Sequence, residues 1–191
     1  MRDFTLPDPF KWLCDSYRKG ALALSLTLCL VLLLVMQVLD GLLKTEAAPR
    51  GIISYEMAQT PMVAQGILAS WSQEAKIHAA FSLGIDYLFM LVYAFFIGLA
   101  CVQLGRGLST RWPKRGMAGL VLAWGQVLAA VCDAVENLAL FRLLIGSTLE
   151  MWSLVAWSCA VIKFSLIGMG WLYILCGGVI LLTVKLFANR R

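Results

Sequence analysis

The sequence predicts an all-α integral membrane protein, folded as a bundle of four transmembrane helices in one membrane domain (residues 1–191). Of its residues, 61% are hydrophobic and 14% are charged, whereas soluble domains are about half apolar and about a quarter charged. The mean hydropathy is +0.82. The apolar residues are concentrated in long runs that are almost free of charge, and about 20 such residues can cross a bilayer as a helix.

Four apolar runs define the predicted spans, at 21–43, 78–104, 116–138 and 164–184. The first run is longer than the core of a signal peptide, which has about 7–15 residues, so we expect it to be retained. The stretch 147–163 is also apolar, and together with the fourth span it is too long for one crossing. We therefore expect an outer extension of the fourth span, or a break in the helix near Gly168 and Gly170.

The placement of Lys and Arg predicts that both termini are cytoplasmic, because cytoplasmic loops carry an excess of these residues. The segment 1–19, the loop 105–115 and the C-terminal tail hold most of them, namely Arg2, Lys11, Arg18, Lys19, Arg106, Arg111, Lys114, Arg115, Lys185, Arg190 and Arg191. The loop 44–76 balances three basic residues with three acidic ones, which indicates the outer side. This bias is typical of a bacterial inner membrane.

Two short motifs predict where helices begin near the ends of the chain. Asp8 followed by Pro9 resembles an N-cap with proline at the first helical position. We expect it to start an interfacial helix within residues 1–19 on the cytoplasmic leaflet. Ser147 and Glu150 have the spacing of a capping box, which predicts the start of the extension before the fourth span.

The outer loop 44–76 is predicted to be partly helical. Thr60 and Pro61 are a third start signal, and the helix that they begin should run through Ile67 to Trp71. We expect the loop to form a cap over the outer end of the bundle.

A set of polar residues inside the spans is the candidate functional site, because each charge in a span costs about 2.5–3.5 kcal/mol on insertion scales. These residues are Asp40, Asp86, Asp133, Glu136, Asn137 and Lys163. Counted from the cytoplasmic ends at 1.5 Å per residue, they all lie near the outer interface. Asp133, Glu136 and Asn137 share one helical stripe, and Tyr93 lies seven residues after Asp86 on the same face.

We expect this set to bind a lipid-like or small ligand, or a cation. Its candidate ligand-binding residues are Asp40, Asp86, Tyr93, Asp133, Glu136, Asn137 and Lys163. If the carboxylates converge, some must hold protons or bind a cation, because they outnumber the bases. The alternative is a structural role, in which the carboxylates pair with Lys163 and Arg142 and close the bundle, as in an accessory subunit of a membrane complex.

A second alternative is an intramembrane hydrolase that uses Asp86 and Asp133 as a catalytic carboxylate pair. In size, number of spans, orientation and outer aspartates, the chain resembles lipoprotein signal peptidase. The asparagine- and aspartate-containing blocks of that family are absent, and Asp133-Ala-Val-Glu136-Asn137 does not match them. The resemblance is therefore one of architecture.

The remaining features narrow the cofactors and partners. The sequence indicates no particular cofactor and no metal site of the paired-histidine kind. It has six cysteines but no C-x-x-C pair, which argues against a disulfide-exchange enzyme. The net charge of +5 comes from bases at span boundaries, so nucleic acid is not an expected partner. The expected partners are the lipid bilayer, a ligand, and a second copy of the chain or a membrane-complex subunit.

Overall fold

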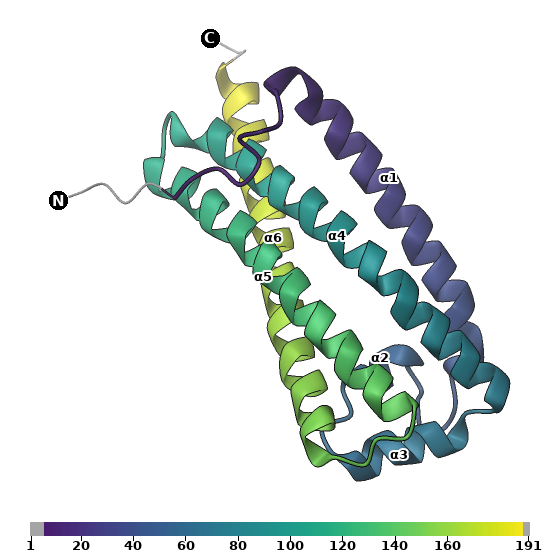
Figure 1. Ribbon diagram of the computed structural model, residues 1–191. Coiled ribbons are helices and arrows are strands. Elements are labelled where there is room, and N and C mark those ends of the chain that lie inside the picture. The colour runs from purple at the N-terminus through teal and green to yellow at the C-terminus, as the bar shows by residue number, and fades with distance from the viewer. Residues whose placement is uncertain (1–5, 189–191) are drawn as a thin grey trace. The chain divides into compact units, whose positions relative to one another are not determined.

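The computed structural model describes residues 6–188, and within that range every regular element is helical. In chain order the elements are α1 (Asp15–Leu39), the 3₁₀ turn η1 (Asp40–Leu43), α2 (Ile52–Glu56), α3 (Pro61–Ser70), α4 (Gln73–Ser109), α5 (Pro113–Leu144) and α6 (Glu150–Ala188) (Figure 1). Arg2, Arg190 and Arg191, which contribute to the orientation prediction, lie outside the described residues.

Four helical segments are long and apolar enough to cross a membrane, so the number of candidate spans is the one that the sequence predicts. They are Asp15–Leu43, Gln73–Ser109, Pro113–Leu144 and Glu150–Val184. Each contains the corresponding predicted span and extends beyond it at one end or both.

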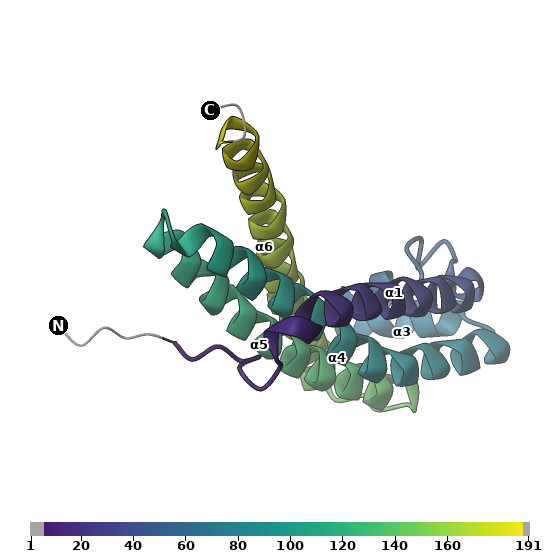
Figure 2. The same cartoon turned by 90° about the horizontal axis from the view of Figure 1, so that it is seen from above.

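Of the two expectations for the end of the chain, the helix break near Gly168 and Gly170 is wrong. From Glu150 onward the predicted extension and the fourth predicted span form one helix, α6, which continues through both glycines (Figures 1 and 2). Glycine weakens a helix but does not interrupt it.

Ser147 does not cap α6, because it belongs to the end of α5. Gly146 has φ +97°, the Gly146 amide donates to the Leu143 carbonyl, and the Ser147 amide donates to the Arg142 carbonyl, each at 3.0 Å. This is the Schellman arrangement, in which a glycine of positive φ ends a helix. The α6 helix then begins at Glu150.

The predicted helix starting at Asp8 is also wrong, since residues 9–13 form turns and α1 begins at Asp15. Asp8 does act locally, because its side chain accepts a hydrogen bond from the Phe10 amide at 2.8 Å. The Arg18 guanidinium donates to the carbonyls of Phe10 (2.8 Å) and Leu13 (3.2 Å). A helix over this segment would need those same carbonyls for its own hydrogen bonds.

The helix predicted at Thr60 is confirmed as α3. The Thr60 side chain accepts a hydrogen bond from the Val63 amide at 3.4 Å, and Pro61 occupies the first turn, where its missing amide hydrogen costs nothing.

The chain divides into two compact units, and each of the four long helices contributes a segment to both. The terminal unit comprises the chain up to Leu26, Tyr93–Ala129, and the chain from Ser165. The loop unit comprises Thr27–Val92 and Ala130–Phe164, so it holds α2 and α3.

In the terminal unit, glycines allow α4 and α5 to approach closely. A Cβ atom at Gly105 would lie 2.9 Å from the Gly116 carbonyl oxygen, and one at Gly119 would lie 2.6 Å from that of Cys101. These positions act as small-residue contacts between helices, a packing mode common in membrane proteins.

The core of the loop unit is built from α2, α3 and small residues of the long helices, including Ala75, Ala79 and Ala139. Two aromatic residues of this core each donate a hydrogen bond to a backbone carbonyl of another segment. The Tyr55 hydroxyl donates to the Leu140 carbonyl at 3.0 Å, and Trp71 Nε1 donates to the Leu43 carbonyl at 2.9 Å. The two rings meet edge to face with centroids 5.2 Å apart.

The turn before α2 depends on Gly51 and Asp40. Gly51 has φ +58° and ψ −128°, a conformation that only glycine adopts readily. The Asp40 carboxylate lies against the Gly51 Cα and accepts a hydrogen bond from the Ile52 amide at 2.7 Å. Asp40 therefore anchors the start of α2, and it pairs with Lys44 at 3.7 Å.

We predict that Gly51→Ala destabilises the purified protein in detergent by at least about 1–3 kcal/mol, the cost of a non-glycine residue in such a conformation. The new methyl group would also collide with the Asp40 carboxylate. The control is Gly66→Ala in α3, where a Cβ meets nothing within 4 Å, and alanine should be neutral or stabilising by up to about 1 kcal/mol. Equal melting temperatures for the two variants would contradict this account of the turn.

Candidate functional site

A buried cluster of charges in the loop unit surrounds the ammonium group of Lys163 on α6. Its Nζ atom donates to Asp133 Oδ1 at 2.7 Å and lies 3.0 Å from Glu136 Oε1. All three side chains are at most 5% exposed. The pairing of carboxylates with Lys163, which the sequence analysis gave as part of the structural alternative, is consistent with this geometry.

A second buried pair in the same unit joins α4 to α5. Asn137 Nδ2 donates to Asp86 Oδ2 at 2.8 Å. Asn137 lies one turn after Asp133 on α5, so both residues project from the same face of that helix. The helical stripe inferred from the sequence thus presents its polar groups to α4 and α6.

Glu56 is a member of the cluster that the sequence analysis did not identify. It ends α2, its side chain is 8% exposed, and its Oε2 lies 3.7 Å from Lys163 Nζ. The sequence contains a pattern that predicts its burial: Ile52, Tyr55 and Glu56 recur with helical spacing, and they are the buried residues of α2. Glu56 was counted instead as one of the loop charges that indicate orientation.

Burial raises the pKa of Glu56 above its ordinary value, because the charged form loses its hydration. The positive charge of Lys163 opposes this effect, while the negative charges of Asp133 and Asp40 add to it. The neutral form of Glu56 is therefore favoured more than it would be in water.

Negative charge exceeds positive charge in this part of the loop unit. Four buried carboxyl groups, those of Glu56, Asp86, Asp133 and Glu136, accompany one buried ammonium group. Within the described residues, Glu136 Oε2 and Asn137 Oδ1 receive no hydrogen bond, whereas Glu136 Oε1 and Glu56 Oε2 are in ion pairs with Lys163 Nζ. Buried groups of this kind normally have partners, so Glu136 Oε2 can accept a proton or a hydrogen bond, and Asn137 Oδ1 can accept a hydrogen bond. We refer to Glu56, Asp86, Asp133, Glu136, Asn137 and Lys163 as the Lys163 cluster.

Three other residues that the sequence analysis considered for this site do not belong to the Lys163 cluster. Asp40 anchors the start of α2, and Tyr93 is buried in the terminal unit rather than in the loop unit. The Arg142 guanidinium lies over the Trp152 ring, 5.6 Å from its centroid, which is a cation–π contact.

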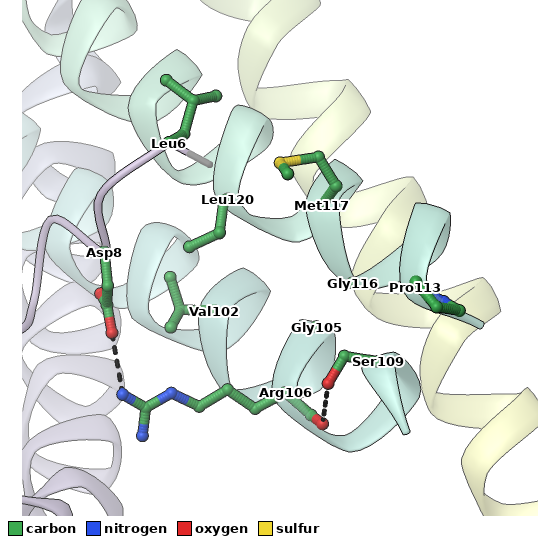
Figure 3. A pocket seen from close by; sticks show the side chains of 10 residues that line it. All are labelled: Leu6, Asp8, Val102, Gly105, Arg106, Ser109, Pro113, Gly116, Met117 and Leu120. Atoms are coloured by element: carbon green, nitrogen blue, oxygen red, sulfur yellow. Dashed lines mark hydrogen bonds and ion pairs between the residues drawn. The ribbon is translucent and has the colours of Figure 1, made fainter. Parts of the chain in front are cut away.

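The structure has two further cavities whose walls, among the described residues, include no residue of the Lys163 cluster. In the loop unit, Gln59, Thr60, Pro61, Glu150, Met151 and Leu154 line a cavity of about 590 Å³. The other, in the terminal unit, has a volume of about 370 Å³ and is mostly apolar, with Leu6, Val102, Met117 and Leu120 on its walls (Figure 3). Its one cationic side chain, Arg106, already pairs with Asp8 at 2.9 Å and Asp15 at 2.5 Å.

The described residues contain no group of three or more His, Cys, Asp or Glu arranged to hold a metal ion. Three carboxyl groups of the Lys163 cluster, those of Glu56, Asp133 and Glu136, lie within 3.7 Å of the Lys163 ammonium group.

We predict that Lys163 and Glu136 are energetically coupled. Lys163→Met and Glu136→Gln should each destabilise the protein in detergent, by up to about 3–5 kcal/mol, because each leaves a buried charge without its partner. The double variant should recover part of the loss, with a coupling energy of about 0.5–3 kcal/mol. Simple additivity of the two effects would show that the residues do not interact.

The raised pKa of Glu56 predicts a pH dependence of stability. Above the ordinary value of 4.5, unfolded Glu56 has lost a proton that the folded state still binds, so stability falls as pH rises through the raised pKa. Glu56→Gln removes this contribution, so the melting temperature of the variant should increase relative to that of the wild type as pH rises. The matched control is Glu46→Gln, at an exposed position, which should keep the wild-type slope. Equal slopes in the wild type and Glu56→Gln would disprove the assignment.

Because comparisons with known proteins give no match, the function is proposed from the geometry of this cluster. No protein-family model, curated protein or solved structure matches the chain.

Proposed function

We propose that the chain is an integral membrane protein that binds a small cationic ligand in the Lys163 cluster. The ligand is a free organic or inorganic cation, or the cationic headgroup of a lipid. The observation that carries this proposal is the excess of buried carboxyl groups around one ammonium group, together with one carboxylate oxygen, Glu136 Oε2, that receives no hydrogen bond within the described residues.

Membrane insertion is supported by the surface of the candidate spans. On α1, Leu24, Leu34 and Val38 are between 63% and 77% exposed. A continuous surface of this kind is costly in water and is favourable against lipid tails. We propose four crossings that form a bundle with both termini cytoplasmic, because the loop 105–115 holds four bases and no acid.

The need for a cation follows from the cost of burying charge. If all four carboxyl groups were ionised, the cluster would carry a net charge of −3, since one ammonium group opposes four carboxylates. An uncompensated buried charge costs several kcal/mol, so protons or a bound cation must supply the balance. A bound cation would replace protons, which predicts that binding releases them.

Glu56 connects the proposed cation site to the loop that is expected on the outer side. In the proposed topology, α2 and α3 belong to the outer loop 44–76 and form the cap over the bundle. Glu56 is the one carboxylate of the cluster that this loop supplies.

The hydrolase alternative needs Asp86 and Asp133 to act together on one water molecule. In the structure they have different partners, since Asn137 donates to Asp86 and Lys163 donates to Asp133. Binding is therefore the function that the geometry favours.

The topology predicts which loops a reagent can reach in intact cells. A cysteine introduced at Gln59 should react with a membrane-impermeant maleimide, and one introduced at Ser109 should react only after permeabilisation. Both substitutions belong in a background in which the native cysteines are replaced. Labelling of both positions in intact cells would refute the four-span topology.

The binding proposal is tested by melting temperature in detergent at constant ionic strength. The probes are the chlorides of sodium, potassium, ammonium, ethanolamine and choline, of which the last two represent lipid headgroups. At about 100 times its dissociation constant, a bound cation adds about 2.7 kcal/mol of stability. We expect one class of cation to raise the melting temperature of the wild type and to raise that of Glu136→Gln less.

The control is again Glu46→Gln, which should respond as the wild type does. Equal responses to every cation in the wild type, or an undiminished response in Glu136→Gln, would contradict binding at the cluster. A response to ethanolamine or choline alone would assign the ligand to the lipid headgroup class.

A further inference from the structure

The cavity of the terminal unit has a polar part and an apolar part (Figure 3). Its polar part is lined by the exposed residues Arg106, Ser109 and Pro113, where α4 ends and α5 begins. Val102 and Leu120 line the apolar part. Leu120 lies seven residues after Pro113, which is about 10 Å along α5. The cavity thus runs from the charged ends of two helices into their apolar segments.

The size and lining of the cavity fit a ligand that is polar at one end and apolar at the other. The volume of about 370 Å³ falls in the range of ligand pockets, about 300–1,000 Å³. Val102 and Leu120 belong to the candidate spans, so a free ion would leave this part of the wall without a favourable contact. A polar group joined to a hydrocarbon chain matches both parts, and this is the structure of a lipid.

The guanidinium group of Arg106 keeps donors for an anion, although it is paired. Its side chain is 46% exposed, and its bonds to Asp8 and Asp15 use two of the five N–H donors of an arginine. Arg18 pairs with the same two carboxylates, at 3.1 Å and 3.0 Å. Two arginines therefore neutralise two aspartates, and the aspartates leave no excess of negative charge at the cavity.

The segment that joins α4 to α5 adds an excess of positive charge at the polar part. Besides Arg106, the loop 105–115 contains Arg111, Lys114 and Arg115, and it contains no acid. Lys114 and Arg115 are exposed in the first turn of α5, and the free backbone amides of a first turn also favour anions. Basic pockets between transmembrane helices are suited to the phosphate groups of anionic lipids.

We propose that this cavity binds an anionic phospholipid. Its phosphate lies against Arg106 and the first turn of α5, and an acyl chain lies beside Val102 and Leu120. In the proposed topology the lipid belongs to the cytoplasmic leaflet. Leu6 and Asp8 line the same cavity, so the bound lipid contacts the N-terminal segment together with α4 and α5.

The test separates the two halves of the ligand with three probes. They are dioctanoyl phosphatidylglycerol, glycerol phosphate, which lacks the chains, and dioctanoylglycerol, which lacks the phosphate. The melting temperature of the full-length protein in detergent is measured with each, at constant ionic strength and sodium concentration. We expect the phospholipid to raise it more than either half does. No probe is an organic cation, so the result does not depend on binding at the Lys163 cluster.

Two variants test the location of the site. Leu120→Trp fills the apolar part and Arg106→Gln removes the charge, and each should reduce the shift caused by the phospholipid by at least about half. The matched controls are Val121→Trp, next to Leu120 and 50% exposed, and Arg50→Gln, at an exposed position in the loop unit. Both controls should keep the wild-type shift.

Each shift is taken against the same variant without lipid, so a change in intrinsic stability does not enter it. Leu120→Trp breaks no ion pair, and it decides the outcome if Arg106→Gln does not fold. An equal shift with glycerol phosphate would replace the lipid by a free anion, and an equal shift with dioctanoylglycerol would remove the role of the charge. An undiminished shift in Leu120→Trp would place the lipid outside the cavity. Each of these results would overturn the proposal.

Discussion

The ammonium group of Lys163 is the charge on which the arrangement of the loop unit depends. It is the one buried cation among the described residues of that unit, and carboxylates from α2 and α5 converge on it from 2.7 to 3.7 Å. A lysine in such a place is stable only if carboxylates surround it, and the carboxylates are stable only if a cation or protons accompany them. Each member therefore constrains the positions of the others, and α6, α5 and α2 are held together by charge as well as by packing.

The number of spans and the partners of Lys163 could both be predicted from the sequence, for the same physical reason. Hydropathy marks the spans, and a charge inside a span is so costly that it must have a partner at the same depth. Counting residues from the cytoplasmic ends placed Lys163 level with Asp133 and Glu136, and the ion pairs in the structure agree with that alignment. Depth along a helix is set by a fixed rise per residue, which makes it readable from sequence.

The features that escaped prediction depend on contacts between distant segments. Glu56 lies in a loop, so no depth could be counted for it, and its burial follows from where α2 packs. No helix begins at Asp8, where the Arg18 guanidinium donates hydrogen bonds to the carbonyls of Phe10 and Leu13. Ser147 does not begin α6, because its amide donates to the Arg142 carbonyl at the end of α5. Local motifs give candidate helix ends, and tertiary contacts decide among them.

The central claim is that the excess negative charge of the Lys163 cluster is balanced by protons or by a bound cation. Infrared spectroscopy of the purified protein tests it most directly, because protonated and ionised carboxyl groups absorb at different frequencies. At neutral pH and without the ligand, we predict a buried protonated-carboxyl band that weakens when the bound cation is added and when Glu56 and Glu136 are replaced by glutamine. The Glu46→Gln variant should leave the band unchanged. Absence of any protonated carboxyl group in the cation-free protein would contradict the claim, because the cluster would then hold its full negative charge without compensation.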